Sequence, residues 1–503
     1  MLLDVFQRFP TATAPKLRRL SATRAIFSFP VILGAFLVVL TILTMRERFS
    51  DPDMWWHLKT GEIIWNTHHI PTVDSFSFTT NNHAYVPHEW LSQLIIYAAY
   101  RFGGYTGLML GFCLSASLLV VVGYALSALY SSNLKVAFLG GLIVWFFGTI
   151  GLSIRPQMIG YLFLVCELLV IHLGRARDRR WFFTLPPMFA LWVNCHGSFF
   201  LGLIVLAATL ACSFIDLEWG LLASDRWTQD QRKTLAVAFV LSIAALFLNP
   251  IGLKQVTYPL ETLLNQTLQT NAVEEWQPLH LDDPRGVALL AITGLILLVP
   301  LLRRAQLTLQ ELVLLAFGFG LAVQHERMLF AFGILAAPIF CRVLADCWDR
   351  YEPDRDRPVM NAVVIAILLS VVVWNFPDRQ QLTLQVERNN PTKAVDFLNR
   401  SGLSGNMFNE YVYGGYLIWA APRHKVFVDG RGDVFEWTGV LEEYGKWVTL
   451  QTDPNILLNK YQIQFCILSA GAPMSDVLPL LSGWTQVYSD EMAVIWSKSG
   501  AYR

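Results

Sequence analysis

Charged residues are scarce in this sequence. They make up 15% of its 503 residues, against about 25% in a soluble globular protein. The 38 lysines and arginines balance 38 aspartates and glutamates, so net charge gives no reason to expect a nucleic acid or a strongly acidic partner. Hydrophobic residues make up 54% of the chain, and this much apolar surface indicates burial in a lipid bilayer.

Several motifs of common function classes are also missing. The 7 cysteines show no C-x-x-C spacing, so neither a zinc site nor a disulfide framework is indicated. We find no internal repeat, low-complexity tract or glycine-rich phosphate loop. Evidence on function must therefore come from where the few polar residues lie.

The long apolar runs predict an all-α polytopic membrane protein. By the length needed to span a bilayer, we count about 11 transmembrane helices. Their predicted ranges are 25–45, 104–130, 134–151, 157–173, 181–193, 199–215, 235–248, 287–302, 309–323, 329–345 and 359–374. Basic residues precede the first run and no small-x-small cleavage site follows it, so we expect an uncleaved helix after a cytoplasmic segment, residues 1–24.

Lysine and arginine gather in alternate loops, as the positive-inside rule requires of cytoplasmic loops. The residues in question are Arg175, Arg177, Arg179, Arg180, Arg226, Arg232, Lys233, Arg303, Arg304, Arg350, Arg355 and Arg357. We therefore predict a multi-pass protein of the cytoplasmic (inner) membrane. Its transmembrane domain is residues 25–376, its long first outer loop is residues 46–103, and an odd number of spans puts the C-terminus outside.

The C-terminal part, residues 385–503, regains polar and charged residues, and none of its apolar runs is long enough to span. Asn390 and Pro391 predict the start of a helix that ends near Gly402. Strands are predicted at 425–428 and 465–468, and a hairpin at 487–495. We expect a small α/β domain outside the membrane.

The first outer loop opens with the sequence DPDMWWHL, which contains Asp51, Asp53 and His57. Proline stiffens the backbone between the two carboxylates, and Trp55 and Trp56 suit the membrane interface. A carboxylate held there can act as a general base or, with its neighbour, can bind a divalent metal. The alternative is that Asp51 only caps a short interfacial helix.

His88 and Glu89 open an apolar stretch that extends to Tyr100. The stretch predicts an amphipathic helix on the membrane surface. Both residues are candidates for substrate contacts, although a capping role for Glu89 and an interfacial role for His88 are slightly favoured.

Further polar residues lie where predicted helices reach the outer face. They are Arg155, Asn194, His196, Glu275, His325 and Arg327. Ionisable groups at such positions are costly and point to function, unless they only snorkel from helix ends. Arg155 and Arg327 suit a phosphate or pyrophosphate, because guanidinium pairs with its oxygens in a bidentate manner. We expect the set to converge with Asp51 and Asp53 on one cavity, for a lipid-phosphate donor and a hydroxyl acceptor.

The string 51–61, the triplet at 88–90 and the sequence NCHG at 194–197 resemble a bacterial subgroup of the GT-C superfamily of membrane glycosyltransferases. That superfamily includes protein O-mannosyltransferases, aminoarabinose transferases of lipid A and oligosaccharyltransferase catalytic subunits. Its members have many helices, an acidic pair in a long first outer loop and, in many cases, a soluble C-terminal domain. The architectural likeness covers nearly the whole chain, whereas the motifs cover few residues. Asp-Pro-Asp replaces the Asp-Glu pair of the protein mannosyltransferases.

The resemblance implies an enzyme that moves a sugar from a polyprenyl-phosphate donor to an extracytoplasmic glycan, lipid or protein. It implies that Asp53 is the catalytic base, with Asp51 as second candidate, and that Arg155 and Arg327 contact the donor phosphate. The remaining candidates for substrate binding are His57, His88, Glu89, Asn194, His196, Glu275 and His325. No cofactor is certain, and a divalent metal at Asp51 and Asp53 stays open.

Two other functions compete with this one. A lipid-linked glycan transporter or flippase should have polar residues through the midplane and an internal repeat. The polar residues that we single out lie at one face and there is no repeat, so transport ranks lower. A non-catalytic subunit of an envelope polysaccharide assembly system would use the C-terminal domain to bind a partner.

The C-terminal domain carries the sequence DGRGD, residues 429–433. It could bind an acceptor glycan, but we favour a turn in which Arg431 pairs with an aspartate. We expect the nearby aromatic residues to pack the domain onto the membrane rather than to stack on sugars. These residues are Tyr411, Tyr413, Tyr416 and Trp419.

Overall fold

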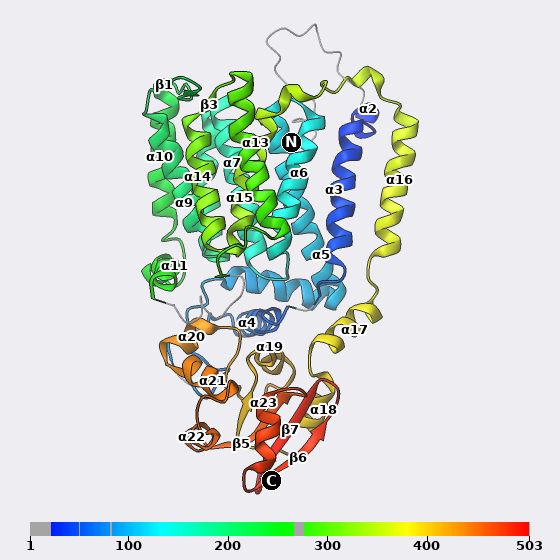
Figure 1. Ribbon diagram of the computed structural model, residues 1–503, viewed down its shortest axis with the longest axis vertical. Helices are drawn as coiled ribbons and strands as arrows, with labels where there is room; N and C mark the ends of the chain where they lie inside the picture. The colour runs from blue at the N-terminus through cyan, green and yellow to red at the C-terminus, as the bar shows by residue number, and fades with distance from the viewer. Residues whose placement is uncertain (1–21, 50, 81–82, 266–275, 502–503) are drawn as a thin grey trace.

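The computed structural model describes residues 22–49, 51–80, 83–265 and 276–501. Figure 1 shows a region of roughly parallel helices and, at one end of it, a C-terminal region of short helices and strands, residues 379–501. We call that end of the helical region the docked end and the opposite one the far end. The helices of the helical region are α2 (Ala22–Ile26), α3 (Phe29–Met45), α4 (Met54–Thr67), α5 (Trp90–Ser131), α6 (Leu134–Gly148), α7 (Gln157–Ala176), α8 (Leu185–Cys195), α9 (Phe199–Ser213), α10 (Gln229–Ala245), α11 (Leu253–Asn265), α13 (Pro284–Arg303), α14 (Leu309–Gln324), α15 (Leu329–Val343) and α16 (Pro358–Asn375).

Every run that the sequence predicts to span contains a helix. Within the described residues, five helices are long and apolar enough to cross a membrane: α5, α6 extended to Gly151, α7, α13 and α16. Shorter apolar helices include α3, α9 and α14. The protein is therefore a helical membrane protein, while the number of spans and their direction stay predictions.

Helix α5 has two arms that meet at Gly104, whose φ of 57° and ψ of −146° are not helical. Glycine alone adopts such angles readily. The first arm, residues 90–103, crosses the docked end, and the second runs into the helical region (Figure 1). Both predicted helices are confirmed, while the position of the first arm on the membrane surface stays a prediction. Helix α11, near the docked end, was not predicted.

The C-terminal region contains a four-stranded sheet with strand order β4-β5-β7-β6. The first pair is parallel and the other two are antiparallel. The helix predicted from Pro391 and the hairpin are confirmed, although the hairpin strands begin and end further out. The elements are α17 (Arg379–Asn389), α18 (Thr392–Arg400), β4 (Asn406–Asn409), α19 (Tyr411–Ala420), α20 (Gly432–Trp437), α21 (Val440–Val448), α22 (Pro454–Lys460), β5 (Ile463–Ser469), α23 (Pro473–Val477), β6 (Trp484–Ser489) and β7 (Ala493–Lys498).

The predicted strand at 425–428 is wrong as part of this sheet. Its Val426 instead exchanges backbone hydrogen bonds with the first loop, accepting from Phe78 N–H at 3.2 Å and donating to Phe76 O at 3.0 Å. Residues 425–428 thus pair with a loop that is distant in the sequence instead of with a neighbouring strand of the sheet. The second, minor sheet lies at the far end and joins β1 (Glu218–Trp219), β2 (Leu222–Ala223) and β3 (Leu307–Thr308).

Helix α19 packs the C-terminal region against α4. The rings of Trp55 and Tyr416 meet edge to face with centroids 5.0 Å apart, and Trp419 meets Tyr100 of the first arm of α5 in the same way at 5.2 Å. Tyr416 and Trp419 thus pack the region onto α4 and α5, while the predicted packing of the aromatic residues onto the membrane stays a prediction.

Candidate active site

Asp51 and Asp53 stand directly before α4 at the docked end. Asp51 Oδ1 accepts the backbone N–H of Asp53 at 2.9 Å, which fixes the turn that starts the helix. Arg155, just before α7, joins them. Its Nε lies 2.5 Å from Asp51 Oδ2 and its Nη1 lies 3.2 Å from Asp53 Oδ2. The acidic pair of the first loop and a guanidinium about a hundred residues later therefore form one cluster.

Asp53 has the environment of a base. Its Oδ1 accepts Trp56 Nε1–H at 3.2 Å. Burial raises the pKa of Asp53, Arg155 opposes this rise, and Asp51 adds to it, so that the pKa reaches about 6. Such a carboxylate is ionised at neutral pH and is a stronger proton acceptor than an exposed aspartate.

The C-terminal region closes over this carboxylate. A Cβ built at Gly430 would overlap Asp53 Oδ1 and would lie 3.1 Å from Trp56 Nε1. Glycine is needed at residue 430 because only backbone fits against the carboxylate. A Cβ at Gly415 would likewise overlap Pro52 O. The sequence offered residues 429–433 as a possible glycan contact, but nothing in it indicated that Gly430 lies against Asp53.

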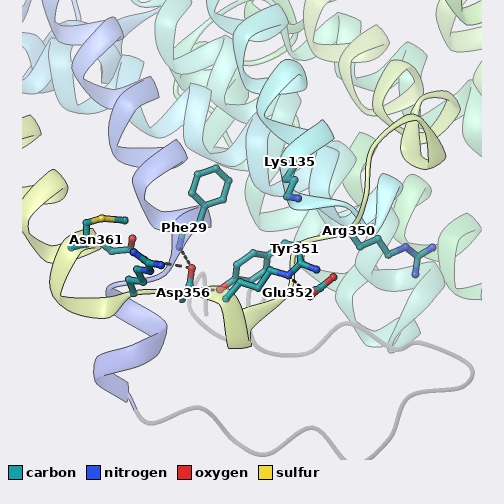
Figure 2. A pocket seen from close by; sticks show the side chains of 10 residues that line it. Phe29, Lys135, Arg350, Tyr351, Glu352, Asp356 and Asn361 are labelled. Atoms are coloured by element: carbon teal, nitrogen blue, oxygen red, sulfur yellow. Dashed lines mark hydrogen bonds and ion pairs between the residues drawn. The ribbon is translucent and has the colours of Figure 1, made fainter.

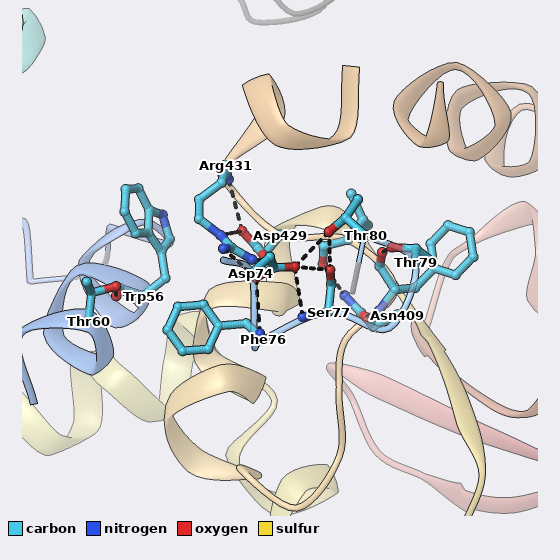
Figure 3. Close-up of polar contacts among 12 residues, drawn as sticks. Trp56, Thr60, Asp74, Phe76, Ser77, Thr79, Thr80, Asn409, Asp429 and Arg431 are labelled. Atoms are coloured by element: carbon cyan, nitrogen blue, oxygen red, sulfur yellow. Dashed lines mark hydrogen bonds and ion pairs between the residues drawn. The ribbon is translucent and has the colours of Figure 1, made fainter. Parts of the chain in front are cut away.

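Arg431 fastens the loop before α20 (residues 421–431), which we call the closing loop, to the first loop of the chain (Figure 3). It donates from Nε and Nη2 to the two oxygens of Asp429 at 2.8 and 2.6 Å, and from Nη1 to Asp74 Oδ1 at 2.7 Å. All three side chains are at most 1% exposed. The guanidinium also lies over the rings of Phe76 and Tyr85, at 4.8 and 5.0 Å from their centroids. The expected pairing of Arg431 with an aspartate is confirmed, and Asp74 is a partner that we did not predict.

Asp74 is bound from its own loop as well. Its carboxylate accepts the hydroxyl of Ser77, the hydroxyl of Thr80 at 2.7 Å and the backbone N–H of Phe76 at 3.1 Å. Burial alone would raise the pKa of Asp74, but the charge of Arg431 and these hydrogen bonds outweigh burial, so the pKa is lowered. Asp74 is therefore a buried anion at neutral pH.

Next to the acidic pair, Glu89 lies among three histidines. Its oxygens lie 3.4 Å from His196 Nε2, 3.7 Å from His88 Nε2 and 3.8 Å from His57 Nδ1. Ser198 donates its backbone N–H to His196 Nδ1 at 3.0 Å, which leaves the proton of a neutral His196 on Nε2, facing Glu89.

Burial sets the charges of this cluster. It raises the pKa of Glu89 to about 8, even though Arg327 and Arg155 oppose the rise. It lowers the pKa of His88 to about 4 and those of His57 and His196 well below 6.5. At neutral pH the site therefore holds an ionised Asp53, a protonated Glu89 and neutral imidazoles.

Arg327 follows α14 and also lies at the docked end. Its Nη2 donates to Gln157 Oε1 at 2.7 Å, two residues from Arg155, and its guanidinium lies 4.8 Å from the centroid of Trp276. It is also the cation that acts most strongly on the pKa of Glu89. The structure thus brings Arg155 and Arg327 to one place.

The other candidates have structural partners. Asn194 Oδ1 accepts Trp90 Nε1–H at 2.8 Å, and its amide donates to Ala190 O and Leu248 O. His325 Nδ1 is 2.7 Å from Trp276 O. Both sit at the edge of the cluster, and their contact with substrate stays a prediction. Glu275 lies outside the described residues.

Tyr258 is a member that the sequence did not reveal, since it comes from the unpredicted α11. Its hydroxyl hydrogen bonds to Asp433 Oδ2 of the C-terminal region. Its ring stacks on His88, with centroids 4.3 Å apart. Tyr258 therefore links the histidine cluster to α20 of the C-terminal region.

A divalent metal would need Asp51 and Asp53. Within the described part of the chain, no three His, Cys, Asp or Glu side chains are grouped to hold an ion. Arg155 takes one oxygen of each carboxylate, and protein N–H groups take the others. This donor set does not fit a metal, and we derive no step through one.

No protein-family model and no curated protein matches the chain. Solved structures do. The chain is 13% identical to ArnT from Cupriavidus metallidurans bound to undecaprenyl phosphate, with 96% of this chain and 100% of that one covered and a TM-score of 0.54. It is 12% identical to the apo oligosaccharyltransferase of Archaeoglobus fulgidus, with 88% and 69% covered and a TM-score of 0.54.

A second structure of the archaeal enzyme, tethered to an acceptor peptide, gives 13% identity, 94% and 75% coverage and a TM-score of 0.54. Both neighbours are GT-C glycosyltransferases. The chain therefore has the fold of the GT-C membrane glycosyltransferases, and the resemblance stated from the sequence is confirmed for the fold. Function has to be argued from the site.

Proposed function

We propose that the protein is a membrane glycosyltransferase that moves a sugar from a polyprenyl-phosphate donor to a hydroxyl of an extracytoplasmic glycan, lipid or protein. The observation that carries the proposal is the pairing of a carboxylate of raised pKa, Asp53, with Arg155 at the docked end. The neighbours support the donor class, since ArnT was solved with undecaprenyl phosphate and the archaeal enzyme with dolichol phosphate. The basic loops at the far end support an outward-facing docked end in the inner membrane.

In the proposed reaction, Asp53 accepts the proton of the acceptor hydroxyl. The acceptor oxygen forms a bond to the anomeric carbon as the bond from that carbon to the donor phosphate oxygen breaks. The lipid phosphate leaves with the bonding electrons. Arg155 and Arg327 stabilise its developing charge, which is the electrostatic part of catalysis. Asp51 positions Arg155 through its 2.5 Å contact.

The neutral groups around Glu89 support the same reaction. A protonated Glu89 adds no negative charge beside a departing phosphate, and it can donate a hydrogen bond. The histidines are uncharged at neutral pH. These groups bind and orient the substrate in our proposal.

The test is sugar transfer by the purified full-length protein in lipid nanodiscs. Labelled polyprenyl-phosphate sugars serve as donors, with a panel of glycan, lipid and peptide acceptors. Asp53→Asn should lower the transfer rate by about 10²-fold or more, the usual contribution of a general base. Asp396→Asn, on the exposed face of α18, is the matched control and should keep full activity. Full transfer by Asp53→Asn contradicts the assigned base.

The transport alternative gains one observation. Glu167 lies inside α7, fully buried, and neither of its oxygens has a hydrogen-bond partner among the residues that the structure describes. A single buried carboxyl group does not line a transport path through the membrane, so we keep the glycosyltransferase as the proposed function. A non-catalytic assembly subunit would tolerate Asp53→Asn and Arg327→Gln in a polysaccharide-production assay, whereas the enzyme would not.

A further inference from the structure

A cavity of about 300 Å³ lies at the far end, away from the candidate active site. Figure 2 shows the side chains that line it. Four cationic and two anionic side chains line it. The cations are Lys135, Arg350, Arg355 and Arg357. It opens among the first residues of α3, α6 and α16, three helices of 15 to 18 residues, whose N-terminal dipole ends favour an anion.

Both acidic residues of the cavity already have partners within the protein. Asp356 accepts the backbone N–H of Phe29 at 3.2 Å, the Asn361 amide at 3.4 Å and the hydroxyl of Tyr351. Glu352 pairs with Arg355 at 2.7 Å. Asp356 therefore fastens the loop before α16 to the start of α3, and Glu352 compensates one of the four cations, Arg355.

Three of those cations have no carboxylate partner within the described residues: Lys135, Arg350 and Arg357. Separate segments supply them, because Lys135 is in α6 whereas the two arginines flank the loop before α16. Three cations around one cavity match a phosphate group in charge and in hydrogen-bond donors.

The surroundings indicate that the phosphate belongs to a lipid. Helix α16 stands at the edge of the helical region and packs on α3 (Figure 1). Its apolar side chains are exposed, for example Val359 at 81% and Val373 at 79%. Such a face in a membrane protein meets acyl chains, and the cavity lies at the end of that face, where head groups lie.

The geometry points to a binding site for the phosphate head group of an anionic phospholipid, held by Lys135, Arg350 and Arg357, with the acyl chains along α16. The site is separate from the proposed transfer reaction. It would fix the otherwise weakly attached α16 against α3.

The experiment uses native mass spectrometry of the full-length protein in detergent with an equimolar mixture of phosphatidylglycerol and phosphatidylcholine. The wild type should retain phosphatidylglycerol preferentially. The triple variant Lys135→Gln, Arg350→Gln, Arg357→Gln should lose about tenfold or more of that preference, because it removes the three cations that attract the anionic head group. The charge-preserving triple Lys135→Arg, Arg350→Lys, Arg357→Lys should keep most of it.

The matched control is Arg226→Gln, Arg303→Gln, Arg304→Gln, which removes three exposed cations of the predicted inner loops outside the cavity. Equal loss in both glutamine triples would show a diffuse charge effect and overturn the site, as would unchanged retention in the cavity triple. Displacement of the lipid by millimolar inorganic phosphate would overturn the lipid assignment in favour of free phosphate. The melting temperature in neutral detergent reports whether each variant folds.

Discussion

Replacing Arg431 by methionine should detach the C-terminal region from the first loop. The substitution keeps a long side chain but removes three hydrogen bonds and leaves Asp74 and Asp429 buried without a counter-charge. Removing one partner of a buried ion pair costs about 3–5 kcal/mol. Since Asp74 keeps its hydroxyl donors, we expect the lower end, about 3 kcal/mol. At roughly 2.1 cal/mol/K per residue over 503 residues, this lowers the melting temperature of the whole chain by about 3 °C.

The assay is thermal unfolding of the detergent-solubilised protein, followed together with the rate of proteolytic cleavage in residues 420–440. Lys446→Met is the matched control, because the Lys446–Glu442 pair is about half exposed and should contribute at most about 1 kcal/mol. Adding Asp74→Asn and Asp429→Asn to Arg431→Met should recover part of the loss by removing the unpaired charges. A single Arg431→Met variant that melts like the wild type would refute the reasoning.

Three further predictions concern transfer activity. The value of kcat/KM should rise as pH increases through about 6, where Asp53 loses its proton, and should fall above about 8, where Glu89 ionises beside the donor phosphate; a flat profile between those limits would contradict both roles. Gly430→Ala should lower activity by about 10²-fold, because its Cβ displaces Asp53, whereas Gly445→Ala, whose Cβ meets open space, should leave the rate unchanged. Activity should survive exhaustive EDTA treatment, because Arg155 occupies the carboxylates of Asp51 and Asp53. If EDTA abolished activity and Mg²⁺ or Mn²⁺ restored it, the conclusion that these carboxylates bind no metal would be wrong.

The sequence predicted the helices because the bilayer imposes a simple requirement on them. An apolar run near 20 residues long is a signal within one segment, and the bias of lysine and arginine orders successive segments. From these two signals Asp53 and Arg155 fall at the same end of different helices, and the structure places them 3.2 Å apart at their nearest charged atoms. The predicted topology therefore left only a few residues as possible partners of Asp53.

The contacts of the C-terminal region could not be predicted in the same way. Arg431 pairs with Asp74, which is 357 positions away, and no period or spacing relates the two. Residues 425–428 carry the alternation of a strand, yet the first loop supplies their hydrogen bonds. Alternation indicates a half-buried extended segment but does not say which partner pairs with it.

The raised pKa of Asp53 depends on both halves of the molecule. Burial is its largest cause, and part of that burial comes from Gly430, which touches the carboxylate. Asp429, held by Arg431, adds a like charge that raises the pKa further. If the C-terminal region moved away, water would reach Asp53 and its pKa would fall toward the ordinary value, which would weaken it as a base. The region outside the helices is therefore a part of the proposed active site, because it makes an aspartate basic enough to deprotonate a hydroxyl.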